Sequence, residues 1–230
     1  MKKNILLIGG SRGIGLSVAT LLHDTHNLFI ASRTKGNLDS LDVNHIHFDA
    51  TLEKLDLTLL PQDIHGFVYC PGSINLKPFK MLTSDNFESE MNLNFIGMIK
   101  VFKTVIDRLA DKSSVVFFST VAVKKGMPYH SSVAAAKGAI EGFGKAIAAE
   151  YATKFRVNII APSLVDTPLS KRLLNNDKKK EANALRHPMN RIGTPDDIAN
   201  MVVFLLSEQS SWMTGQVIGV DGGTSTLNVN

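Results

Sequence analysis

Four closely spaced glycines follow the first apolar run of the chain. The run Ile5–Ile8 leads directly into Gly9, Gly10, Gly13 and Gly15, and a helix-compatible stretch comes next. Glycines at such a turn let backbone N–H groups approach a pyrophosphate, and the N-terminus of the following helix adds partial positive charge. The order of strand, glycine turn and helix therefore predicts a dinucleotide site. The residues expected to line it here are Gly9, Ser11, Arg12, Gly13, Ile14 and Gly15.

The residues after the second apolar run bear on which dinucleotide binds. An acidic residue there would bond a ribose 2′-hydroxyl and repel a 2′-phosphate. The chain instead continues Ser32-Arg33-Thr34, and Arg12 lies in the glycine turn. Two guanidinium groups are suited to hold a phosphate, which favours NADP over NAD. The alternative is that both arginines are merely solvated.

The elements that must position these residues alternate along the chain. Short apolar runs, several of them continuous, are typical of strands buried on both faces, and amphipathic stretches between them predict helices. The predicted strands are Ile5–Ile8, Leu28–Ala31, His45–Phe48, Gly66–Cys70, Val115–Ser119, Val157–Ile160 and Gln216–Val220. The predicted helices are Gly13–His23, Ser84–Leu109, Ser131–Lys154, Lys171–Ala184 and Pro195–Leu206. This alternation predicts a doubly wound α/β fold with a seven-stranded parallel sheet flanked by helices.

Composition excludes several other classes of protein. The chain has 230 residues, 44% hydrophobic and 20% charged, which is typical of a folded globular protein. With no break in composition, residues 1–230 are expected to form one domain. The single cysteine, Cys70, excludes an internal disulfide framework, and the histidine spacing predicts no metal site. A net charge of +4 is far from that of a nucleic-acid-binding tail, and no apolar run is long enough to span a membrane. The expected location is cytoplasmic, with the N-terminus forming a strand rather than a signal peptide.

Several ordered motifs resemble the short-chain dehydrogenase/reductase family. The glycine spacing Gly9-x-x-x-Gly13-x-Gly15 is similar to the family's glycine signature. The segments Ala161–Pro168, Arg191–Ala199 and Thr214–Gly223 resemble its motif over the nicotinamide, its run into the last long helix and its C-terminal strand. The likeness covers nearly the whole chain and is greatest to 3-oxoacyl carrier-protein reductases. It implies a homodimer or homotetramer built through the two long helices.

The resemblance also implies further cofactor contacts. Asp49 and Ala50 follow the third strand, where the family holds the adenine. Tyr69-Cys70-Pro71-Gly72 replaces the family's Asn-Asn-Ala-Gly, of which only the glycine is kept. Besides Arg33, which the charge argument selects, the residues expected to contact the cofactor beyond the glycine turn are Asp49, Ala50, Cys70, Pro71, Gly72, Lys137, Pro162, Val165 and Thr167.

The catalytic pattern departs from that of the family. The family uses Tyr-x-x-x-Lys, and this chain has Val133 four residues before Lys137. Asn92 and Thr120 match the family's Asn and Ser, with Ser119 as the neighbouring candidate for the latter. Valine has no proton to give to a substrate oxygen, so Tyr129, His130 or a water molecule is predicted to take that part. The alternative is that Tyr129 and His130 only line the rim of the pocket.

Two functions follow from this pattern. The first is an NADP-dependent oxidoreductase acting on a carbonyl or hydroxyl substrate, 3-oxoacyl compounds included, with an atypical active site. The second is a catalytically inactive relative that binds a dinucleotide or a partner protein. A group of basic residues has two interpretations: a solvated helix face, or a surface that attracts an acidic acyl carrier. These residues are Lys171, Arg172 and Lys178–Lys180. The family's enoyl reductases have six residues between Tyr and Lys, and the corresponding position here is His130. Their glycine loop also differs from this one, so the sequence argues against that activity.

Overall fold

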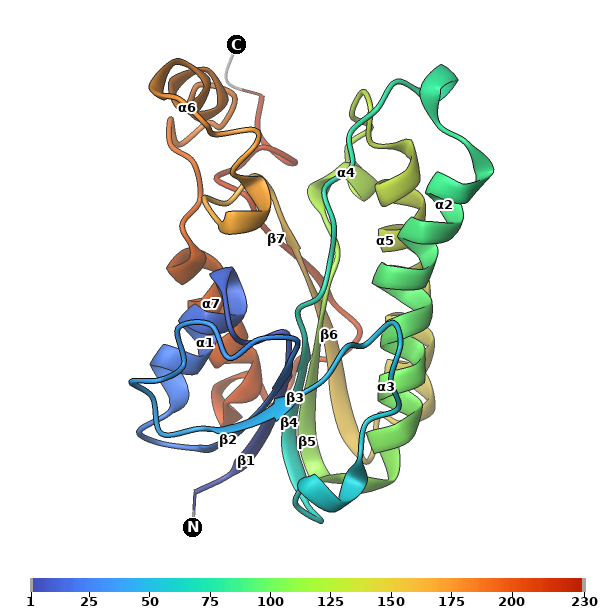
Figure 1. The fold of residues 1–230 in the computed structure, drawn as a ribbon, viewed down its shortest axis with the longest axis vertical. Coiled ribbons are helices and arrows are strands. Elements are labelled where there is room, and N and C mark those ends of the chain that lie inside the picture. The colour runs from blue at the N-terminus through green and yellow to red at the C-terminus, as the bar shows by residue number, and fades with distance from the viewer. Residues whose placement is uncertain (1, 229–230) are drawn as a thin grey trace.

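The computed structural model describes residues 2–228, and its centre is a parallel sheet of seven strands. The strand order is β3-β2-β1-β4-β5-β6-β7 (Figure 1), and every neighbouring pair is parallel. The strands are β1 (Asn4–Ile8), β2 (Asn27–Ser32), β3 (Asn44–His47), β4 (Ile64–Tyr69), β5 (Leu109–Phe118), β6 (Phe155–Pro162) and β7 (Val217–Val220). The predicted fold class and all seven strands are confirmed.

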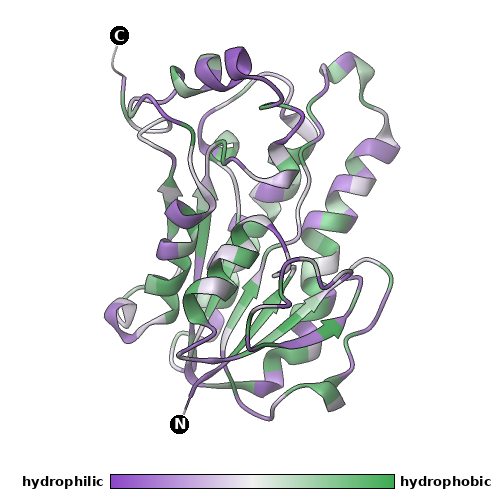
Figure 2. Cartoon of the chain, turned by 60° about the vertical axis from the view of Figure 1, so that its left-hand side comes forward, coloured by the Kyte–Doolittle hydropathy of each residue, from purple (hydrophilic) through white to green (hydrophobic). Residues whose placement is uncertain are grey.

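Helices cover both faces of the sheet, because its central strands are apolar on both sides. Helices α1 (Gly13–Leu22) and α7 (Pro195–Leu206) pack together on one face. On the other face lie α2 (Ser84–Met91), α3 (Gly97–Val105) and α5 (Ser131–Glu150) (Figure 1). Two short helices, α4 (Val121–Lys124) and α6 (Asp177–Ala184), lie beyond the carboxyl ends of the strands. Figure 2, coloured by hydropathy, shows that the strands are mainly hydrophobic and that α6, on the outside of the molecule, is mainly hydrophilic.

Aromatic rings fill the layer between the sheet and α3 and α5. The ring of Phe102, on α3, lies 5.5 Å from that of Phe117 and 5.7 Å from that of Phe67, centroid to centroid. Phe143 and Phe155 complete the cluster, at 6.2 Å and 6.3 Å from Phe102. Most of these pairs are edge-to-face or tilted, which is the arrangement that aromatic quadrupoles prefer. The cluster ties α3 and α5 to β4, β5 and β6.

Helix α7 begins as its sequence predicts. The Thr194 hydroxyl accepts from the Asp197 backbone N–H, and the Asp197 carboxylate accepts from the backbone N–H of Thr194. Arg191 adds a two-pronged ion pair to Asp197, at 2.6 Å and 2.8 Å. Hydrogen bonds from Arg191 and Thr194 hold the pKa of the Asp197 carboxyl well below its usual range. This capping box positions α7 against α1, the helix that follows the glycine turn.

The structure corrects the bounds of three predicted helices. The stretch Ser84–Leu109 is not one α-helix, because a wide π-helical turn, Asn92–Ile96, separates α2 from α3. The Asn94 side-chain amide donates to the Glu90 carbonyl, competing with the regular backbone ladder. The stretch Lys171–Ala184 is helical only from Asp177, where Asn176 caps the first turn. Helix α5 ends at Glu150 rather than at Lys154.

The connection from β2 to β3 is a short loop that lies against the glycine turn. Gly36 in this loop has φ of +57°, and a Cβ added there would come within 2.5 Å of the Ser11 carbonyl oxygen. Only glycine allows this approach, so the loop and the glycine turn are in direct contact. Within residues 2–228, none of the helices has both the length and the apolar character needed to cross a bilayer.

Candidate active site

A cavity of about 410 Å³ opens where the carboxyl ends of β4, β5 and β6 meet the start of α1. Each of these elements contributes to its lining: Ile14 from α1, Cys70 after β4, Phe118 from β5 and Pro162 from β6. Ligands of open parallel sheets bind at this edge, because the connections on the two sides diverge there. The cavity therefore lies beside the predicted dinucleotide turn.

The glycine turn has the geometry that the sequence predicts. Gly9 and Gly13 have φ of +81° and +54°, a region that other residues rarely adopt. A Cβ on Gly15 would come within 2.6 Å of the Gly9 carbonyl oxygen. Glycine at these positions lets the turn pack this closely against the start of α1.

The residues predicted for the adenine end lie on neighbouring segments. Arg12 and Arg33 are both exposed, and they flank the contact between the glycine turn and the β2–β3 loop. Asp49, after β3, accepts from the backbone N–H and hydroxyl of Thr51. These bonds, with a smaller contribution from the positive charge of Arg33, lower the pKa of the Asp49 carboxyl. Ala50 beside it is buried.

Lys137 is the buried cation of the cavity. Its side chain is 7% exposed, and its Nζ donates to the Phe118 carbonyl oxygen at 3.1 Å. Burial lowers the pKa of the ammonium group to about 8, although the negative charge of Glu90 opposes the shift. A Cβ on Gly72 would lie 3.4 Å from both Lys137 Nζ and Asn94 Oδ1, so these two polar atoms flank Gly72. The cavity thus has positive charge at its inner end.

A buried polar cluster behind Lys137 was missed from the sequence. The Glu90 carboxylate accepts from the Ser73 hydroxyl, from the Asn75 amide at 2.7 Å and from the Asn94 amide at 2.9 Å. Asn94 is fully buried, and within residues 2–228 its Oδ1 atom has no hydrogen-bond partner. The predicted Asn92 lies two residues away, exposed, at the start of the wide turn. The structure corrects this prediction, because the buried asparagine that flanks Gly72 together with Lys137 is Asn94. No pattern of spacing marks Glu90, because it lies on an otherwise polar helix.

The predicted catalytic residues are brought together only in part. Val133 lines the cavity one turn before Lys137 on α5, and it is 6% exposed. Thr120 and Ser119 line it as well: Thr120 caps α4, and the Ser119 hydroxyl donates to Glu141. His130 reaches the cavity. Tyr129 is 58% exposed and, of the described residues, is not one that lines it.

The opposite wall comes from the segment after β6 and from the C-terminal segment. Pro162, Val165 and Thr167, which the resemblance implies as cofactor contacts, line this wall, and Thr167 faces Gly13. Pro71 packs against Gly9 on the other side of the turn. Sequence reasoning missed His187 on this wall, which is 5% exposed and bonded to Ser163 at 2.9 Å. The one hint of His187 in the sequence is its partner Ser163, which stands after Pro162 where the family has a glycine.

The lowered pKa of Lys137 makes stability depend on pH. The unfolded chain binds the lysine proton up to about pH 10.4, whereas the folded chain releases it near pH 8. Unfolding therefore takes up a proton between these values, and stability rises with pH across the window. We expect the stability of the wild type relative to Lys137→Met to increase by at most about 3 kcal/mol from pH 8 to pH 10.5. Urea unfolding of both proteins across that range measures it; a flat difference would contradict the shift.

Comparisons with known proteins agree with this geometry. The family described as enoyl-(acyl carrier protein) reductase matches residues 30–225. A 3-oxoacyl acyl-carrier-protein reductase of Chlamydia muridarum is 30% identical, with 97% of each chain covered. A short-chain dehydrogenase family protein of Francisella tularensis superposes with a TM-score of 0.90 at 27% identity, over 99% of this chain and 100% of that one. The protein ElxO, solved with NADP bound, superposes with a TM-score of 0.88 at 25% identity, over 99% of this chain and 100% of that one.

The sheet, the glycine turn and the cavity at its edge, together with these likenesses, define a protein of the oxidoreductase class. The chain belongs to the short-chain dehydrogenase/reductase family.

Proposed function

We propose that this protein is an NADP-dependent oxidoreductase that interconverts a carbonyl and a hydroxyl group, with 3-oxoacyl compounds as the substrate class. The observation that carries the proposal is the placement of Lys137 in a cavity that adjoins the glycine turn. When bound, NADPH supplies a hydride. The apolar lining, from Ile14, Val121 and Val133 among others, excludes water from such a step.

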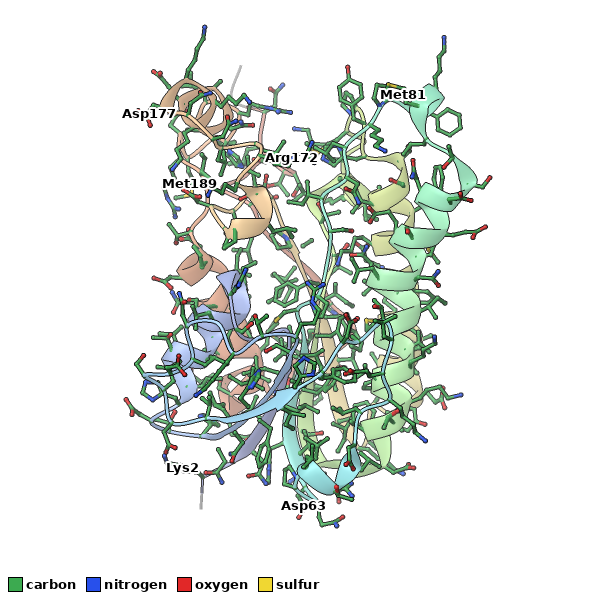
Figure 3. The ribbon with its side chains drawn as sticks, in the orientation of Figure 1. Lys2, Asp63, Met81, Arg172, Asp177 and Met189 are labelled. Carbon is green, nitrogen blue, oxygen red and sulfur yellow. The ribbon has the colours of Figure 1, made fainter. Side chains whose placement is uncertain are left out.

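A cationic surface beside the cavity supports an acyl substrate on an acidic carrier. Arg186 lines the cavity mouth, and Lys178 and Lys179 are exposed on α6 above it. Figure 3 shows Arg172 and Asp177 in this same upper segment. Lys180 is partly neutralised by Asp166, at 3.0 Å. The remaining cations attract a phosphate or an acidic partner toward the opening.

The preference for NADP rests on the two exposed arginines. Because Gly36 holds the β2–β3 loop against Ser11, Arg12 and Arg33 project from two segments in contact. We expect Arg33→Ala to lower NADPH affinity about tenfold and to leave NADH affinity unchanged, since a charge-assisted bond contributes roughly 1.5–3 kcal/mol. Calorimetric titration measures both. Lys35→Ala is the matched control, because Lys35 is a cation of the same loop already paired with Asp39; equal losses in both variants would contradict the assignment.

The atypical feature of the proposed site is Val133, which has no proton to donate. His130 is the predicted donor that reaches the cavity, although its Nδ1 is bonded to the Pro128 carbonyl oxygen at 2.7 Å.

The absence of a proton donor at Val133 favours a second function, an inactive family member that binds NADP or a partner protein. Turnover separates the two. Calorimetry with NADPH and NADH comes first, followed by a panel of 3-oxoacyl thioesters and simple ketones. Tight NADPH binding without turnover would favour the binder.

A further inference from the structure

Ser163 and His187 form a hydrogen-bonded pair in the cavity wall. Ser163 follows β6, and His187 follows α6, so two separate segments are joined by this contact. The Ser163 hydroxyl lies 2.9 Å from His187 Nε2. On the other side of the ring, Nδ1 lies 2.9 Å from the Asn183 carbonyl oxygen. Both residues also line the cavity.

The second contact decides which ring nitrogen carries the proton. A carbonyl oxygen only accepts hydrogen bonds, so Nδ1 must be the donor to Asn183. In the neutral ring, Nε2 then has a lone pair and accepts from the Ser163 hydroxyl. In the charged ring, Nε2 donates to Ser163, and the hydroxyl proton of Ser163 is free to point into the cavity. The orientation of the ring is the same in both states.

The ring is held in place by packing as well as by hydrogen bonds. Gly222, with φ of +59°, lies against it, and a Cβ there would come within 3.5 Å of His187 Cβ. Asp221, in the same C-terminal segment, is close enough for the imidazole to affect the pKa of its carboxyl. Lys125 ties that segment to the far side of the cavity by donating to the Thr224 carbonyl oxygen at 2.9 Å. The pair therefore faces the cavity on one side and a second, smaller cavity of about 220 Å³, lined in part by Asp221 and Gly222, on the other.

We propose that Ser163 and His187 form the proton relay of the active site. This inference rests on the proposed function. In reduction, bound NADPH would supply a hydride to the carbonyl carbon, and the C=O π electrons would move to oxygen. The oxygen takes the Ser163 hydroxyl proton, and Ser163 takes the Nε2 proton of charged His187. The products are the alcohol, NADP⁺ and neutral His187, which regains its proton from solvent. Oxidation runs the same steps in reverse.

Other cavity groups are less suited to this step. They include the predicted donor His130, whose ring bond within residues 2–228 is to the Pro128 carbonyl oxygen and not to a second proton carrier. Burial raises the pKa of the Cys70 thiol to about 12, which makes it a poor acid. Lys137 Nζ and Lys125 Nζ each donate to a backbone carbonyl. The Ser119 hydroxyl is committed to Glu141. Ser163 is a hydroxyl with a second proton carrier directly behind it, which is the arrangement that general acid–base catalysis needs.

Single and double variants test the relay. We expect Ser163→Ala and His187→Gln each to lower kcat about 100-fold with NADPH affinity unchanged, and the double variant to lose no more than either single one, because the two act as a unit. Ser163→Thr keeps the hydroxyl and should retain kcat within a few-fold. Ser114→Ala is the matched control: its hydroxyl, on β5, is also buried and bonded, to the Leu205 carbonyl oxygen, but Ser114 is not one of the residues that line the cavity. An unchanged kcat in Ser163→Ala, or multiplied losses in the double variant, would overturn the relay.

Nitrogen NMR of histidine-labelled wild type and Ser163→Ala gives a readout independent of turnover. The neutral ring of His187 should carry its proton on Nδ1, and the Nε2 resonance should move in Ser163→Ala. A neutral ring protonated on Nε2 overturns the relay even if the enzyme is active. If the wild type turns over no substrate of the panel, the proposed function fails and the relay fails with it. Turnover that persists unchanged in Ser163→Ala removes the relay alone.

Discussion

Replacing Val133 by tyrosine is expected to raise reductase turnover by about 10-fold to 10²-fold. A positioned general acid typically contributes about 10²–10⁴-fold, of which the Ser163–His187 relay is expected to supply about 10²-fold already. Position 133 lies one helical turn before Lys137, and both side chains line the same cavity. A phenol there would project toward the substrate space, and the nearby ammonium group would lower its pKa. Turnover of 3-oxoacyl thioesters with NADPH, compared between wild type and Val133→Tyr, measures the gain.

Val133→Phe is the matched control for this gain. It adds nearly the same volume to the cavity wall without the hydroxyl, so it should leave turnover no higher than that of the wild type. Calorimetry should show that neither variant changes NADPH affinity by more than a few-fold. Equal turnover in the tyrosine and phenylalanine variants would contradict the prediction. A gain specific to tyrosine would show that the remainder of the site is intact.

Replacing Phe102 by alanine is expected to destabilise the fold by about 3–5 kcal/mol, the usual cost of deleting a large buried ring. Phe102 is 1% exposed and is the ring that contacts Phe67, Phe117, Phe143 and Phe155 together. Its removal leaves a cavity between α3 and three strands that the surrounding rings cannot fill. Urea unfolding followed by circular dichroism measures the loss.

Phe79→Ala provides the comparison. Phe79 is 72% exposed, and its ring contact is with Phe87 at 6.5 Å. Its substitution should cost less than about 1 kcal/mol. If Phe102→Ala cost as little as Phe79→Ala, the aromatic layer would not be the main support of that face of the sheet.

The strands could be predicted from the sequence because burial on both faces produces a simple pattern. Val115–Phe118 is apolar at every position, which is unusual outside a sheet covered by helices. The start of α7 was equally plain, since Thr194, Pro195 and Asp197 each favour a helix N-terminus. Local preference and tertiary structure agree at these places.

The helix interruptions and half of the site depend on contacts that sequence spacing does not reveal. At the wide turn, the Asn94 side-chain amide donates to the Glu90 backbone carbonyl oxygen. The Glu90 side chain is itself buried close enough to Lys137 for its charge to affect the pKa of that lysine. The pairing of Ser163 with His187 joins residues 24 positions apart on different segments. Lys137, Val133 and the glycines were found because their spacing along one helix or one turn is itself the signal.

The wide turn at Asn92–Ile96 is equivalent to one extra residue in an otherwise regular helix. Each residue of an α-helix advances the direction of its side chains by roughly 100°. Deleting one residue from this turn would restore an uninterrupted helix from Ser84 to Val105 while α3 remained anchored by its rings. The whole of α2 would then rotate by that angle, and Glu90 would leave the space beside Lys137. The extra residue therefore sets the rotation of α2 relative to α3. Because of it, α3 presents apolar residues to the sheet while α2 presents the Glu90 carboxylate to the active site.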